Sequence, residues 1–149
     1  MNIKEVLFKQ CVLIVNNRMG TVEEIISSNQ KALQSETKSS AGDKHETGRA
    51  MLQLEIEKAS QQLKGINEMK ITLAKIDVFK QHKIAHLGSI IETNHGNYFL
   101  SISAGKLTIY DKNYFAVSTF SPIGKRLLGK KTGEQFTFNG STTKIVTIT

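Results

Sequence analysis

The sequence predicts an α+β protein, in which a long antiparallel helical hairpin precedes a small domain of short strands and one helix. Two observations predict this fold class. In the first half, apolar residues recur every three or four positions, as they do along one side of a helix. From about residue 79 they fall instead into short runs bounded by turn residues. We therefore divide the chain into a hairpin domain, residues 1–78, and an α+β domain, residues 79–149.

The hairpin is predicted by two heptad patterns separated by a polar segment. The first pattern is interrupted only at Asn29 and comprises Phe8, Val12, Val15, Met19, Val22, Ile26 and Leu33. The second comprises Leu52, Ile56, Ala59, Leu63, Ile66, Met69, Leu73 and Ile76. Residues 35–47 between them are rich in Ser, Thr, Asp and Gly, which interrupt helices, so we expect them to form an exposed tip. Each helix would be about 45–50 Å long. A thin hairpin of this length buries little surface per ordered residue, which suggests reach into a narrow space.

The second half is predicted to contain six strands and one short helix. The strands are expected at residues 89–93, 97–103, 106–110, 115–118, 135–138 and 143–148. Asn139-Gly140 is the strongest hairpin signal between two of them. The helix is expected to have Ser121 as N-cap, Pro122 at its first position and Gly129 just past its end.

The charge of the chain is concentrated in its second half. The net charge is +7; residues 1–78 carry 11 Lys/Arg against 10 Asp/Glu, and residues 79–149 carry 9 against 3. A basic surface of this kind suggests an acidic partner, either nucleic acid or an acidic protein patch, or it serves only to keep the domain soluble. No apolar run approaches the roughly 20 residues of a membrane span, and no secretory signal is apparent. We expect a cytoplasmic protein without a membrane partner, in which the single Cys11 is a packing residue.

Two short segments resemble the GreA/GreB family of bacterial transcription elongation factors. Residues 121–134, SPIGKRLLGKKTGE, resemble the family's C-terminal signature, a series of SPIG, LLGKK and Gly-(Asp/Glu) before a final hairpin. Residues 42–46, GDKHE, resemble its Gly-Asp-x-x-Glu tip. Together with the predicted hairpin, the resemblance spans both halves of the chain.

The resemblance implies a fold and a function. It implies an antiparallel coiled coil followed by an FKBP-like domain, in a monomeric factor that is not itself an enzyme. Such a factor inserts its coiled coil into the secondary channel of RNA polymerase and stimulates the polymerase's own cleavage of backtracked transcripts. Its partners would be RNA polymerase and the 3′ end of the nascent RNA. It would bind no cofactor stably by itself, and Mg²⁺ would be held only in the complex with polymerase.

The chemistry of the tip can be stated in physical terms. Hydrolysis by two metal ions needs one ion to activate water and another to stabilise the leaving oxygen, and Mg²⁺ prefers carboxylate ligands. On this hypothesis Asp43 and Glu46 complete a weak second Mg²⁺ site of the polymerase, since two residues three positions apart at a helix start face the same direction. The same spacing also fits a capping box that only stabilises the second helix.

Basic residues around both motifs are candidates for contacts with polymerase or RNA. At the tip these are Lys44, His45 and Arg49. Around the short helix they are Lys125, Arg126, Lys130 and Lys131, which also suit the negative end of the helix dipole. His82 and His86, four residues apart, lack a third ligand at convincing spacing and are expected to be surface residues.

Three alternatives remain open. After Glu46 the sequence continues Thr-Gly-Arg-Ala, where the family tends to have Asn-Ala-Glu-Tyr, so a channel-binding inhibitor without cleavage activity is the nearest rival. An FKBP-like isomerase or peptide-binding module, built on residues 79–149, is a second rival. A coiled coil that pairs between two chains is the third, and sizing and crosslinking would detect it.

Overall fold

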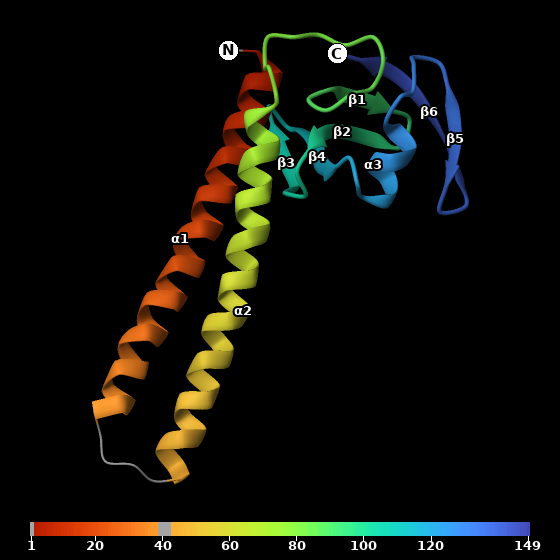
Figure 1. Ribbon diagram of the computed structural model, residues 1–149. Coiled ribbons are helices and arrows are strands. Elements are labelled where there is room, and N and C mark those ends of the chain that lie inside the picture. The colour runs from red at the N-terminus through yellow and green to blue at the C-terminus, as the bar shows by residue number, and fades with distance from the viewer. Residues whose placement is uncertain (1, 39–42) are drawn as a thin grey trace. The chain divides into compact units, whose positions relative to one another are not determined.

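The computed structural model describes the backbone of residues 2–38 and 43–149, and their side chains apart from residues 36–38 and 43–45. Within these residues, two long helices, α1 (Ile3–Lys38) and α2 (Asp43–Ala74), are followed by a six-stranded sheet and a short helix, α3 (Pro122–Leu127) (Figure 1). The predicted α+β class, with a helical hairpin before a small sheet domain, is confirmed.

The contacts within the chain form two compact units. The hairpin unit is Val15–Lys70, and the globular unit combines Met1–Ile14 with Ile71–Thr149. Both long helices therefore run through the two units: the first turns of α1 and the last turn of α2 pack as part of the globular unit.

In the hairpin unit, the predicted heptad positions form the packed seam. Val15, Val22, Ala59 and Ile66 are buried. The remaining predicted seam positions of this unit are half-buried: Met19, Ile26, Leu33, Leu52, Ile56, Leu63 and Met69. Asn29, the one polar interruption, is half-buried and its Nδ2 donates to the Ile25 carbonyl at 2.7 Å, so the amide is satisfied within its own helix. The heptad prediction is thus confirmed by the burial of these side chains.

The helices extend further toward the tip than the sequence predicted. Residues 35–47 were expected to interrupt the helices at the tip, but α1 continues to Lys38, whereas α2 begins at Asp43, where a helix start was expected. Once a helix has nucleated, each added residue gains a hydrogen bond at little further cost, and this propagation overrides the weak helix propensity of Ser and Thr.

The first turns of α1 are fixed to the rest of the globular unit. Leu7 and Cys11 are fully buried, and Cys11 Sγ lies 3.9 Å from Ser101 Oγ. Burial raises the pKa of the Cys11 thiol to about 11, so it stays protonated and acts as a core residue, as predicted. Lys4 is buried too, and its Nζ donates to the Lys80 carbonyl at 2.6 Å. Desolvation lowers the pKa of Lys4, and the nearby Asp77 carboxylate partly offsets that effect.

The six predicted strands are all present, with ends that differ from the prediction by three residues or fewer. They are β1 (Ile90–Thr93), β2 (Gly96–Ser101), β3 (Gly105–Ile109), β4 (Lys112–Ser118), β5 (Gln135–Phe138) and β6 (Ser141–Ile148). Their order in the sheet is β3-β4-β2-β1-β6-β5. Neighbours are antiparallel except β2 and β4, which run parallel because the chain crosses to the edge as β3 and returns as β4.

Two tight turns close the outer strand pairs. Asn139 and Gly140, with φ of 50° and 80°, make the predicted turn between β5 and β6. The turn between β3 and β4 was not predicted, because it is made by Tyr110 and Asp111, which also have positive φ, 49° and 63°. Such backbone is usually occupied by Gly or Asn, and a Tyr-Asp pair gives no such signal.

The sheet is covered on both faces. On β2, Ser101 lies next to Cys11 of α1, and the preceding residue, Leu100, points to the opposite face. There Leu100 joins a buried cluster with Ala85, Ile91, Leu127, Phe136 and Ile145. Leu127 brings α3 into this cluster, and α3 contacts β4 and β5 (Figure 1). The core of the globular unit therefore lies between the sheet and α3 on one side and between the sheet and α1 on the other.

Candidate functional site

The tip motif lies at the start of α2. Asp43 is the first residue of α2, and Glu46 and Arg49 follow at intervals of three along the same helix. Glu46 is exposed and Arg49 is half-buried. The predicted side chains of Asp43, Lys44 and His45 lie outside the described residues. The backbone thus places positions 43 and 46 within the first turn of a helix, where the dipole favours carboxylates.

The Ser-Pro-Ile-Gly segment has a local structural reason for three of its residues. Ser121 is the N-cap of α3; its Oγ accepts from the Gly124 amide at 3.1 Å and donates to the Ser118 carbonyl at 2.6 Å. Pro122 opens the helix, where its missing amide hydrogen costs nothing. Gly124 is buried, and a Cβ added there would overlap the Ser118 carbonyl oxygen. The predicted cap, first position and end of this helix are confirmed, with Gly129 at φ 83° after the last turn.

Two of the four predicted cations near α3 pack on an aromatic ring. The Arg126 guanidinium carbon lies 5.5 Å from the centre of the Phe136 ring, and Lys130 Nζ lies 6.0 Å from it. Both are within cation–π range, so these side chains shield a buried aromatic residue of β5. Lys125 and Lys131 are exposed. Arg126 and Lys130 thus pack on Phe136, and Arg126, like Lys125 and Lys131, remains exposed.

Of a second basic region, next to this helix, the sequence pointed only to His82 and His86, which were expected at the surface; His86 is exposed and His82 is half-buried. Lys80, His82, Lys83 and His86 lie in the segment between α2 and β1 and line a groove of about 620 Å³ together with Leu128 and Gly129 of the loop after α3. The His82 and His86 rings are 5.3 Å apart. His82 Nδ1 lies 2.9 Å from Ser89 Oγ, and desolvation lowers the pKa of His82, helped by Lys4 and His86. The dense run of cations at 80–83 was the available signal.

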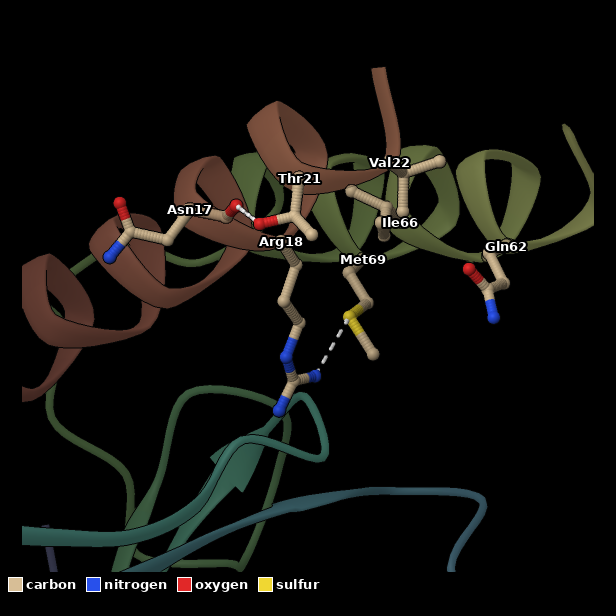
Figure 2. Close-up of a pocket in the computed structure, with 8 residues that line it drawn as sticks. Asn17, Arg18, Thr21, Val22, Gln62, Ile66 and Met69 are labelled. Atoms are coloured by element: carbon tan, nitrogen blue, oxygen red, sulfur yellow. Dashed lines mark hydrogen bonds between the residues drawn. The ribbon is translucent and has the colours of Figure 1, made fainter. Parts of the chain in front are cut away.

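The hairpin unit carries a hollow at mid-length (Figure 2). Val22, Ile66 and Met69 form its apolar part, and the Arg18 guanidinium reaches to 4.0 Å from Met69 Sδ. Gly65 lines the hollow and has no atom within 4 Å of where a Cβ would stand. The hollow has a volume of about 480 Å³, and the absence of a side chain at Gly65 leaves that part of its wall open.

The described side chains do not form a metal centre of the usual kind. Among residues 2–38 and 43–149, as far as their side chains are described, no three His, Cys, Asp or Glu side chains come together to hold an ion.

In the same part of the chain no helix has both the length and the apolar character needed to cross a membrane.

Comparison with known proteins adds no family assignment. No protein-family model matches the chain, and no curated protein matches it significantly. The resemblance therefore rests on residues 42–46 and 121–134 alone, and much of the second segment has structural reasons of its own.

Proposed function

We propose that the protein is a GreA/GreB-like transcription elongation factor, which inserts its hairpin into the secondary channel of RNA polymerase and stimulates cleavage of backtracked transcripts. The observation that carries the proposal is the slender two-helix hairpin with Asp43 and Glu46 in the first turn of its second helix. A thin hairpin buries too little surface per ordered residue to form a large core, but it can carry a short motif into a narrow space.

The carboxylates at the tip are chemically suited to Mg²⁺. Glu46 is exposed, and carboxylate oxygen is the ligand that Mg²⁺ prefers. When bound, the ion would activate water or stabilise the leaving oxygen of the transcript. Two carboxylates supply only part of an octahedral shell, so polymerase and water must supply the rest. Asp43 and Glu46 would therefore hold the ion only in the complex, and the hydrolytic activity would belong to polymerase.

The globular unit would supply attraction to polymerase. Its residues carry 12 Lys/Arg against 5 Asp/Glu, and the predicted contacts Lys125 and Lys131 are exposed there. Lys44, His45 and Arg49 would contact RNA or polymerase at the tip. On this proposal the protein acts in the cytoplasm as a monomer.

Transcript cleavage in a backtracked elongation complex tests the proposal, with polymerase from the same organism. Asp43→Asn and Glu46→Gln are the informative variants, because Asn caps a helix as well as Asp does and Gln replaces Glu in a capping box. If the motif directs a metal ion, each variant loses stimulation by more than about tenfold, at least the cost of losing an outer-shell partner of a metal. If it only caps α2, both variants stay active. Glu55→Gln, an exposed change further along α2, is the matched control and should behave as wild type.

A channel-binding inhibitor is the second candidate, and Arg49 favours it. Arg49 lies three residues after Glu46 in α2, so the two occupy neighbouring places on the helix. In this second proposal the Arg49 guanidinium would compete with Mg²⁺ for the Glu46 carboxylate. If wild-type protein slows elongation without stimulating cleavage, the inhibitor function replaces the proposed one. If the Arg49→Ala variant still slows elongation and still gives no cleavage, Arg49 is not what prevents Glu46 from binding Mg²⁺. If Arg49→Ala confers cleavage, the arginine is what blocks it.

A proline isomerase has less support. The side of the sheet that faces α3 is filled by the fully buried Leu127 and Leu100 together with Phe136. A proline-peptide assay on the full chain is expected to show no acceleration.

A further inference from the structure

The groove beside α3 combines an apolar floor with a cationic rim. We define the basic groove by Lys80, His82, Lys83, Ile84, His86 and Leu128. All six belong to the globular unit, so its form does not depend on the position of the hairpin unit. None of the residues that line it is acidic.

The walls of the basic groove are fixed by backbone hydrogen bonds between segments far apart in the sequence. The Ala85 amide donates to the Lys130 carbonyl at 2.8 Å, and the Gly129 amide donates to the Ala85 carbonyl at 2.8 Å. Ile84 also forms an isolated bridge with Lys131. These bonds hold residues 84–85 beside residues 129–131, so the groove exists before any partner arrives, and little ordering entropy is lost on binding.

The histidines on the rim are held in place by a buried serine. Ser89 Oγ, fully buried, accepts from the His86 amide at 2.9 Å and lies 2.9 Å from His82 Nδ1. His86 Nδ1 lies 3.0 Å from the Leu87 carbonyl. Both histidines are therefore held by contacts with neighbouring groups of the globular unit.

The floor exposes aliphatic surface that a folded domain normally buries. Ile84 is 50% exposed and Leu128 is 44% exposed, although a fully buried leucine, Leu127, is adjacent to Leu128 in the sequence. Two large aliphatic side chains that line one groove and remain half open to water indicate a place for an apolar side chain of a partner.

We propose that the basic groove binds an acidic protein segment that carries an aliphatic side chain, with the side chain on Ile84 and Leu128 and carboxylates at Lys80 and Lys83. Charge complementarity selects an acidic occupant, and Lys131, bridged to Ile84, adds a further cation at the edge. The aliphatic floor favours a protein segment over single-stranded nucleic acid, because bases bind mainly by stacking on large aromatic rings. No Phe, Tyr or Trp lines the groove, and its aromatic rings are those of His82 and His86. This inference goes beyond the proposed function, since it does not involve the carboxylates of the tip.

A titration of the full-length ¹⁵N-labelled chain, followed by NMR, tests the proposal with defined probes. The probes are a blocked hexapeptide of sequence EDLLED, its serine analogue EDSSED, and a short oligothymidylate. We expect EDLLED to shift the amide signals of residues 80–86 and 128–131. EDSSED should bind about tenfold more weakly, because the aliphatic contact is lost.

Matched charge reversals distinguish the groove from the general positive charge of the unit. Lys80→Glu with Lys83→Glu should weaken EDLLED binding by at least about tenfold, since it reverses two rim charges. Lys106→Glu with Lys144→Glu makes the same change in net charge at exposed strand positions outside the groove and should leave binding nearly unchanged. The Lys80 carbonyl that accepts from Lys4 belongs to the backbone, so the substitution retains that bond.

Three results would overturn the proposal. EDSSED binding as tightly as EDLLED would show that the aliphatic floor contributes nothing. Equal weakening by the two double variants would reduce the effect to net charge. Oligothymidylate shifting these signals when EDLLED does not would assign the groove to nucleic acid. Each result leaves the cleavage assay on Asp43 and Glu46 unaffected, so the two proposals fail separately.

Discussion

The globular and hairpin units differ in charge and in packing. Counted over their residues, the globular unit has 12 Lys/Arg against 5 Asp/Glu and the hairpin unit has 8 against 8, so the whole net charge of +7 lies in the globular unit. Among the side chains that the structure describes, 16 buried apolar residues belong to the globular unit and 4 to the hairpin unit. The globular unit thus contains most of the buried apolar side chains and all of the excess positive charge, whereas the hairpin unit has no net charge and few fully buried side chains.

The largest difference in stability between the units is expected when a glycine is replaced by alanine in each of them. Gly124→Ala in the globular unit should cost about 3 kcal/mol or more of unfolding free energy, because the new Cβ overlaps the Ser118 carbonyl oxygen, a backbone atom that cannot move without disturbing α3. Denaturant unfolding monitored by tyrosine fluorescence, from rings that all lie in this unit, measures the loss. A stability equal to wild type would mean that the backbone around α3 is free to adjust.

Replacing a leucine by alanine should also reduce the stability of the two units by different amounts. Leu127→Ala removes a fully buried side chain from the cluster with Leu100 and Phe136 and should cost about 2–5 kcal/mol. Leu63→Ala removes a half-buried seam residue and should cost about 1–2 kcal/mol, because water already reaches that side chain. Hydrogen exchange, which reports on each unit by itself, is the measurement. Equal losses of protection would show that the two units unfold as one.

In the hairpin unit, replacing Gly by Ala should raise stability, the opposite of the effect expected for Gly124→Ala. Gly20 and Gly65 lie within helices, and no atom stands within 4 Å of a Cβ added at either position. Each substitution should therefore slow exchange of neighbouring helical amides by an amount that corresponds to about 1 kcal/mol, the difference in helix propensity. Faster exchange in either variant would reveal a contact that needs the glycine, for instance in the hollow beside Met69.

The smallest effect concerns the pH dependence of the globular unit. The fold lowers the pKa of His82 below its ordinary value of 6.5, chiefly by desolvation. Between the lowered pKa and 6.5 the unfolded chain binds more protons than the folded chain, so stability falls as the pH drops below about 6.5. His82→Gln should flatten this fall between about pH 7 and pH 5. An unchanged slope in denaturant titrations would assign the acid sensitivity to other groups.

Local signals in the sequence predicted most of the fold. The heptads predicted the hairpin, the six apolar runs predicted the strands, and Asn139-Gly140 predicted its turn. The Ser121 cap was recognisable because capping depends only on residues a few positions apart. The Tyr110-Asp111 turn was missed because Tyr seldom adopts positive φ and no Gly marks the turn, although Asp tolerates this conformation.

The two candidate sites also differ in whether the sequence could predict them. The spacing of Asp43 and Glu46 within one helical turn follows from the sequence, since α2 begins there. The basic groove does not, because Ile84 and Leu128 meet only when residues 84–85 pair with residues 129–131. The sequence also could not show that Arg126 and Lys130, two of the four predicted contact residues near α3, pack on Phe136.

By itself the sequence determined the heptad spacing of the two long helices, both ends of α3, the strands and the placement of charge. Each of these depends on neighbours within about one turn or one strand. The tertiary structure alone decided the parallel pairing of β2 with β4 and the walls of the basic groove. These features depend on which distant segments pack together. That choice is made by burial of the shared core around Leu100 and Leu127, and no local pattern encodes it.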